Sequence, residues 1–182
     1  MNTMNFMVWI LPVIFMLHDF EEIIMAEVWG RHYKGRIAEV WPEWKPFGLK
    51  YIHNCQTPSF AIGVAAEFLL SSLISFFSTV FQGYFIWYGA FLGLILHFIL
   101  IHILLCVRFK GYVPGIITSA VFLVPSIWTL YEADKILHYG IGTMLLACLC
   151  GILLTFVLFQ VLHRLMGPWS EQLHKYSEAQ AK

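Results

Sequence analysis

The sequence predicts an all-α integral membrane protein, folded as a bundle of five transmembrane helices. Three observations predict this: 59% of the residues are hydrophobic, only 12% are charged, and the apolar residues fall in long runs. Soluble domains carry roughly 25% charged residues, so a water-exposed surface is excluded for most of this chain. The formal net charge is zero, which gives no reason to expect a nucleic acid as partner.

Five apolar runs are long enough for a membrane span, which needs about 20 residues of helix. They cover residues 6–28, 59–81, 84–107, 113–131 and 139–165. The second and third runs are separated by Gln82 and Gly83 alone, which predicts a tight antiparallel hairpin. We therefore expect one membrane domain over residues 1–182, ending in a polar tail at 167–182.

The basic residues predict the orientation of the bundle. With five spans, ten of the eleven Lys and Arg residues lie on one side and Lys135 lies on the other. The positive-inside rule then places the N-terminus outside and the C-terminus in the cytoplasm. The aromatic loop 30–58 is expected in the cytoplasmic interface or folded back under the bundle. We expect the membrane to be a plasma membrane of the bacterial type.

The first run contains four ionisable residues within five positions, namely His18, Asp19, Glu21 and Glu22. A charge in the middle of a bilayer costs at least about 2.5–3.5 kcal/mol, so such groups usually face a partner, a metal or water. On a helix, Glu21 and Glu22 lie three and four residues after His18, which puts these side chains on one face. An imidazole with carboxylates on one face is a common way to bind a transition metal.

Other spans bring ionisable residues to the same depth. Counted along each helix from its cytoplasmic end, these residues fall in one layer, roughly 8–15 Å below the surface. The layer consists of His18, Glu21, Glu22, Glu67, His97 and His102. We take these six residues as candidate metal ligands, with Glu21 and Glu22 also as candidate catalytic carboxylates.

Helical geometry ranks the two histidines of the third run. Gly89, Gly93 and His97 are spaced by four, so His97 extends a small-residue face that favours close helix packing. His102 lies about 140° further round an α-helix, so the two imidazoles are expected to point in different directions. His102 is therefore an additional ligand or a residue that supports one. Asp19 is placed to hydrogen-bond a ligand imidazole.

The segment His18-Asp19-Phe20-Glu21-Glu22 resembles the motif of the HXXEE family of small integral membrane proteins. That family also carries a Tyr-x-Pro-Gly motif, which reads Tyr112-Val113-Pro114-Gly115 here, and a further histidine, for which His97 or His102 is the match. The resemblance implies a membrane fold with an important polar centre and implies no reaction. Tyr112, Pro114 and Gly115 either start the fourth helix or shape an opening to the site.

Three functions remain open at this stage. Nitrogen and oxygen ligands suit zinc, iron or manganese, in a mononuclear or dinuclear site, and favour a metalloenzyme that hydrolyses a lipid or lipid-linked substrate. The same carboxylates would also serve ion or proton translocation, although the chain shows no repeat of the kind many transporters have. A homo-oligomer could supply the repeated halves that a single chain lacks. The third function is a metal-binding scaffold or sensor, and a purely structural hydrogen-bonded network is the alternative to all three.

Overall fold

The computed structural model describes residues 3–40 and 56–178, and all regular structure within these residues is helical. The elements are α1 (Thr3–Val8), α2 (Ile10–His32), α3 (Lys34–Val40), α5 (Thr57–Phe81), α6 (Phe85–His97), η2 (Phe98–Ile103), α7 (Leu104–Phe109), α8 (Ile116–Leu137) and α9 (Ile141–Glu178). α6, the π-helical turn η2 and α7 form one continuous rod. The all-α prediction is confirmed for this part of the chain, while most of the predicted interfacial loop lies outside it.

Four helical segments in the described ranges are long and apolar enough to cross a membrane. They are Thr57–Phe81, Phe85–Phe109, Ile116–Leu137 and Ile141–Glu178. These correspond to the second to fifth predicted spans, and the last one continues as helix through the predicted tail. α2 is long enough to be a further span, but its acidic residues separate it from these apolar helices. Five spans with an external N-terminus therefore remain a prediction.

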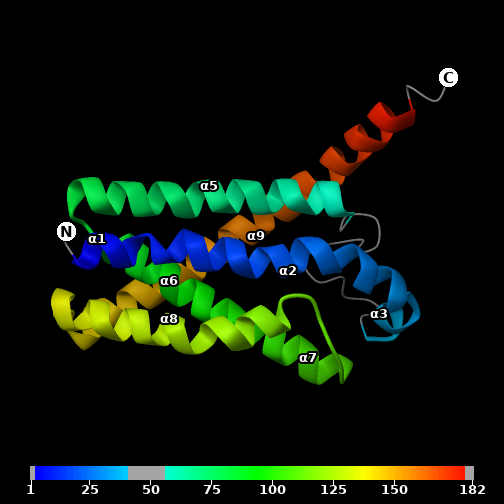
Figure 1. The fold of residues 1–182 in the computed structure, drawn as a ribbon. Coiled ribbons are helices and arrows are strands. Elements are labelled where there is room, and N and C mark those ends of the chain that lie inside the picture. Colours follow the sequence, from blue (N-terminus) through cyan, green and yellow to red (C-terminus); the bar gives the residue numbers. More distant parts are fainter. Residues whose placement is uncertain (1–2, 41–55, 179–182) are drawn as a thin grey trace.

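The helices pack as two crossed pairs with α8 beside them (Figure 1). α2 lies alongside α5, and α6 lies mainly against α9. The turn at Gln82 and Gly83 joins α5 to α6 as predicted, and Gln82 adopts a left-handed φ of 52° to end α5. The two helices diverge after this turn, because each is packed along its length against a different partner.

One end of the bundle carries α3, the start of α5 and the link between α7 and α8 (Figure 1). The other end carries the N-terminus and the turns from α5 to α6 and from α8 to α9. Lys34 and Arg36 in α3 and Lys110 in the link therefore share an end, whereas Lys135 near the end of α8 lies at the other. This is the separation of charge on which the predicted orientation depends.

Pro12 shapes the N-terminal end of the bundle. Proline has no N–H, so it cannot bond to the carbonyl of the residue four positions earlier, which is Val8. The Val8 carbonyl instead accepts hydrogen bonds from Ser75 Oγ at 2.9 Å and from Trp87 Nε1 at 3.0 Å. The break between α1 and α2 thus connects α2 to α5 and α6, and Trp87 is fully buried there.

Glycines set the close contact between α6 and α9. A Cβ atom built on Gly89 would lie 2.5 Å from the Ala147 carbonyl oxygen, and one on Gly151 would overlap the carbonyl of Gly89. The backbones therefore touch directly, as the small-residue face of the third predicted span indicated. The same face ends at His97, which is held toward the interior of the bundle.

The Gly151→Ala substitution is expected to lower the free energy of unfolding by about 1–3 kcal/mol, because the added methyl group pushes α9 away from α6. Gly142→Ala is the matched control, since it lies on the same helix and a Cβ there meets open space. Denaturation in detergent micelles measures both effects. Equal stability of the two variants would contradict a direct backbone contact.

Candidate metal centre

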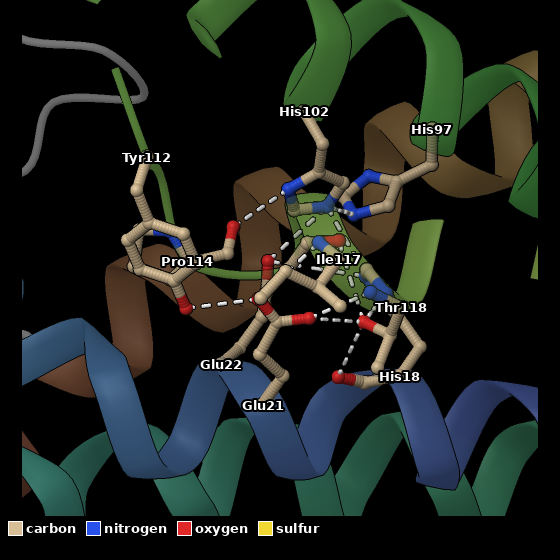
Figure 2. A network of polar contacts seen from close by, with 10 residues as sticks. His18, Glu21, Glu22, His97, His102, Tyr112, Pro114, Ile117 and Thr118 are labelled. Carbon is tan, nitrogen blue, oxygen red and sulfur yellow. Dashed lines mark hydrogen bonds and ion pairs between the residues drawn. The ribbon is translucent and has the colours of Figure 1, made fainter. Parts of the chain in front are cut away.

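Four residues gather in the middle of the bundle with their ligand atoms all within 4.8 Å of one another. They are His18 and Glu22 on α2, His97 at the end of α6 and His102 in η2. His102 Nε2 lies 2.8 Å from His97 Nε2, 3.1 Å from His18 Nε2 and 3.2 Å from Glu22 Oε1 (Figure 2). We call these four residues the His/Glu cluster.

The π-helical turn explains why both histidines of the third span reach the cluster. The prediction that His97 and His102 point in different directions is wrong, because it depends on α-helical geometry between them. A π-helix bonds residue i to residue i+5, so residues five apart come close to the same face. η2 covers Phe98–Ile103 and brings the two rings to a centroid distance of 4.6 Å.

Hydrogen bonding fixes which nitrogen of His102 carries a proton. Nδ1 lies 2.9 Å from the carbonyl oxygen of Pro114, and a carbonyl can only accept. Nδ1 therefore donates, and in the neutral ring Nε2 is left with its lone pair facing the cluster. His102 is 2% exposed, so bulk solvent does not compete for its hydrogen bond to Pro114.

The hydrogen bond between His18 and Thr118 shows in the same way which nitrogen of His18 carries a proton. The Thr118 hydroxyl lies 2.6 Å from Glu21 Oε2 and 3.0 Å from His18 Nδ1. Glu21 receives donors at both oxygens, from Tyr112 O–H at 2.8 Å and from the Thr118 N–H at 2.8 Å, so it acts as an acceptor. Thr118 gives its proton to Glu21 and accepts from His18 Nδ1, which leaves the lone pair of His18 Nε2 facing the cluster.

Two unprotonated nitrogens thus face each other at 3.1 Å, between His18 and His102. Such a contact is repulsive unless a cation lies between the lone pairs. A tetrahedral metal with bonds of 2.0–2.1 Å to imidazole separates its ligand atoms by about 3.3 Å. The contacts of 2.8, 3.1 and 3.2 Å around His102 Nε2 are close to that separation. The cluster therefore fits a small metal ion.

Glu21, a predicted ligand and catalytic carboxylate, lies elsewhere. Its oxygens accept from Tyr112, from the Thr118 side chain and backbone, and from the Ile117 N–H at the start of α8. It thereby caps a helix N-terminus, where a negative charge is stabilised. Burial and the hydrogen bond to Glu21 both raise the pKa of Tyr112, so this phenol stays protonated and keeps donating.

Asp19 and Glu67 lie beside the cluster and are not members of it. A side-chain hydrogen bond joins Asp19 to Glu22, where the sequence predicted a bond from Asp19 to a ligand imidazole. Such a bond needs one proton shared by two carboxyl groups. Glu67, on α5, interacts electrostatically with both carboxyls and lines the same cavity.

The Tyr-x-Pro-Gly segment contacts the centre directly. Tyr112 donates to Glu21 and the Pro114 carbonyl accepts from His102. Gly115 has a φ of +83°, and a Cβ there would overlap His102 and lie 2.9 Å from His18 Cε1. Trp29 holds this segment from the other side by donating from Nε1 to the Tyr112 carbonyl at 2.7 Å.

Sequence reasoning missed Thr118 and the carbonyl of Pro114. The available signal was that Thr118 follows the Tyr-x-Pro-Gly motif by three residues, in the first turn of the helix that this motif starts. Side-chain oxygens at helix N-termini are often paired with nearby polar groups. A backbone acceptor leaves no trace in residue types, so the Pro114 carbonyl could not be found in this way.

A cavity of about 380 Å³ adjoins the cluster, and all four cluster residues line it. Apart from these residues, Asp19 and Glu67, its walls are largely apolar and come from α2, α5, the rod formed by α6 to α7, and α9. The metal-binding face of the cluster therefore opens onto a space that suits hydrocarbon.

Comparison with protein-family models finds a match over most of the chain. The sequence model of the family described as proteins of unknown function with an HXXEE motif matches residues 9–129. The chain belongs to the HXXEE family. The matched region of this HXXEE protein runs from α2 into α8 and includes every residue of the His/Glu cluster, whereas α9 lies beyond it. Neither the curated proteins nor the solved structures contain a match.

The Gly115→Ala substitution is expected to lower the free energy of unfolding by about 2–4 kcal/mol, since the new methyl group adds left-handed strain and displaces two imidazoles. Gly111→Ala is the control, because it lies in the same link and its Cβ would make ordinary contacts of 3.5 Å and longer. Denaturation in detergent measures both. A Gly115→Ala protein as stable as its control would rule out this close packing.

Proposed function

We propose that this HXXEE protein is a membrane metalloenzyme that uses one divalent ion, zinc or iron, to hydrolyse a lipid or lipid-linked substrate. The observation that supports it most is the 3.1 Å contact between the buried Nε2 atoms of His18 and His102, whose Nδ1 atoms are both bonded to other partners. Imidazole ligands suit both metals. A cation at this point removes the repulsion and explains why three histidines converge inside an apolar bundle.

His18, His97 and His102 would hold the metal through Nε2. Catalytic sites usually keep three protein ligands and leave one position for water or substrate, which favours three imidazoles as the complete ligand set. A metal in such a site supplies Lewis-acid polarisation of a carbonyl and activation of water near neutral pH. The cavity beside the ring nitrogens provides the space for that substrate.

Glu22 is the residue best placed to move the proton. Its Oε1 lies 3.2 Å from His102 Nε2, at the edge of the metal position, and Asp19 holds the carboxyl group by a hydrogen bond. In ester hydrolysis, the oxygen of water bonds to the carbonyl carbon while Glu22 accepts a proton from that water. The ester C–O bond then breaks and Glu22 returns the proton to the leaving alkoxide. Glu21 takes no part, because its oxygens are bound to α8.

Proton or ion translocation is the second candidate, favoured by one observation. Asp19, Glu22 and Glu67 interact with one another inside the bundle, as carboxyl groups in a relay do. The cavity that they face is largely apolar, which gives a water-filled path less support. A metal-binding scaffold would share the cluster without the hydrolysis. Metal content and hydrolysis together distinguish the three.

Protein purified in detergent is expected to contain about one equivalent of metal after chelator washing, as in sites held by three imidazoles. His102→Ala is expected to lose most of it, whereas His174→Ala, an exposed residue on α9, keeps it. Glu67→Ala is also expected to keep it. Elemental analysis measures all four proteins. Metal-free wild-type protein, or full retention in His102→Ala, would overturn the proposed centre.

The Glu22→Gln substitution is expected to retain the metal and to lower hydrolysis of long-chain p-nitrophenyl esters by about 10²–10⁴-fold, as for loss of a general base. Glu39→Gln serves as the control, because Glu39 is exposed on α3. Metal content and rate are measured on the same samples. Loss of the metal in Glu22→Gln would show that Glu22 is a metal ligand. An unchanged hydrolysis rate in Glu22→Gln would show that Glu22 has no part in the reaction.

A further inference from the structure

The cavity beside the His/Glu cluster extends in both directions along the helices. On α2 its lining residues are Leu11 and Phe15, then the cluster residues, then Ala26 and Trp29. Leu11 lies seven positions before His18, and Trp29 lies seven positions after Glu22. At the helical rise per residue, each apolar arm is about 10 Å long. The reactive groups therefore lie near the middle of the cavity.

The wall on α5 repeats this order. Thr57 donates its N–H to Glu27 at 2.7 Å, so the start of α5 lies level with the Trp29 end of α2. Ser75 bonds to the Val8 carbonyl, so the later part of α5 lies level with Leu11. Between these two levels, the lining runs from Phe60 and Gly63 through Glu67 to Leu70 and Ile74. A single carboxyl group thus stands between two stretches that, apart from Ser71, are apolar.

The rod formed by α6, η2 and α7 has the same pattern. Near the start of the rod, Trp87 contacts Val8. At its end, Phe109 packs on Trp29 with ring centroids 4.9 Å apart. The start of the rod therefore lies beside the Leu11 end of α2, and its end lies beside Trp29. Ala90 and Leu94 line one arm, His97 and His102 the middle, and Leu105 the other arm. α9 adds Thr155 and four apolar residues to the wall, namely Leu154, Leu158, Leu162 and Met166.

This symmetry restricts the substrate. A phospholipid has its ester next to a charged headgroup, so placing that ester at the cluster would push the headgroup into an apolar arm. Moving an ionised group out of water without a partner is strongly unfavourable. Hydrocarbon on both sides of the reacting carbonyl removes this cost and fills both arms with apolar surface.

We propose that the substrate is an ester of a medium-chain fatty acid with a medium-chain alcohol, lying along the cavity with one chain in each arm and matching the arms in length. The inference rests on the proposed hydrolytic function and adds the substrate class to it. Water supplies its hydroxyl to the carbonyl carbon and its remaining proton to the alcohol oxygen. The products are one fatty acid and one fatty alcohol.

Photo-crosslinking tests this class without requiring activity. Octyl octanoate carrying a diazirine in either the acyl or the alkyl chain is added in detergent to the Glu22→Gln protein, which is expected to bind the ester without hydrolysing it, and labelled peptides are mapped. Labelling is expected at both ends of the α2 lining, near Leu11 and near Trp29. Unlabelled ester should compete about tenfold better than a lysophosphatidylcholine with the same acyl chain, which corresponds to about 1.4 kcal/mol.

Variants that fill one arm provide the matched controls. Gly63→Leu narrows the Trp29 arm, where a Cβ makes only an ordinary 3.7 Å contact with Met166, and Ala90→Phe narrows the Leu11 arm. Each is expected to reduce labelling about tenfold, or about 1.4 kcal/mol. Ala66→Phe points a similar bulk outward from α5 and should leave labelling unchanged. The metal content of each variant, measured in separate samples loaded with metal, is the control for correct folding.

The outcomes separate this inference from the proposed function. Labelling confined to one arm, equal competition by the lysophospholipid, or no specific labelling would each overturn the two-armed substrate while leaving the metal content untouched. Specific labelling of both arms in a protein that binds no metal would retain the substrate class and overturn the metalloenzyme. Both results together support a metal-dependent hydrolase of apolar esters.

Discussion

The carboxylate of Glu21 at the N-terminus of α8 is the interaction on which the centre depends. The first N–H groups of a helix have no partner inside the helix, and Gly115 has no side chain to provide one. Glu21 accepts from the N–H groups of Ile117 and Thr118 and thereby holds α8 against α2. Thr118 then meets His18 and Pro114 meets His102, so the orientation of both imidazoles follows from one charge-to-helix contact.

The other ionisable residues of α2 have separate partners, which explains how a helix this acidic is accommodated. Glu27 accepts from the backbone and side chain of Thr57 and so caps α5, and it also pairs with Arg31. His18 and Glu22 face η2. Together the ionisable groups of α2 contact α5, η2 and α8, and so they set the positions of these three elements relative to α2. Buried polar groups paired in this way avoid the cost of isolated charges in lipid.

Much of the architecture follows from the sequence because hydrophobic length and helical spacing are local properties. The ranges of the four apolar spans, the contact through Gly89 and the shared face of His18 and Glu22 all depend on residues within one or two turns of each other. The π-helical turn at Phe98–Ile103 could not be predicted, because no proline or glycine interrupts the run and the turn depends on packing against other helices.

The roles of individual carboxylates were equally inaccessible to sequence reasoning. Glu21 and Glu22 are adjacent and chemically identical, so spacing alone assigns both to the same face. Which one meets the histidines is decided by the start of α8, about a hundred residues later. A carboxylate can bind either a helix N-terminus or a metal ion, and only the tertiary structure determines which of the two it reaches.

The distribution of the cluster along the chain sets an order for its assembly. α2, α6 and η2 supply the nitrogen and oxygen atoms, but Pro114 and Thr118, which fix two of the rings, come from the link into α8 and its first turn. During synthesis from the N-terminus, the rings of His18 and His102 stay rotationally unrestrained until this last segment arrives. Capture of an ion before then meets mobile, water-accessible imidazoles, while capture afterwards requires passage through hydrocarbon-lined space. With a metal bound as proposed, metallation and the docking of α8 would be coupled steps in the biogenesis of the protein.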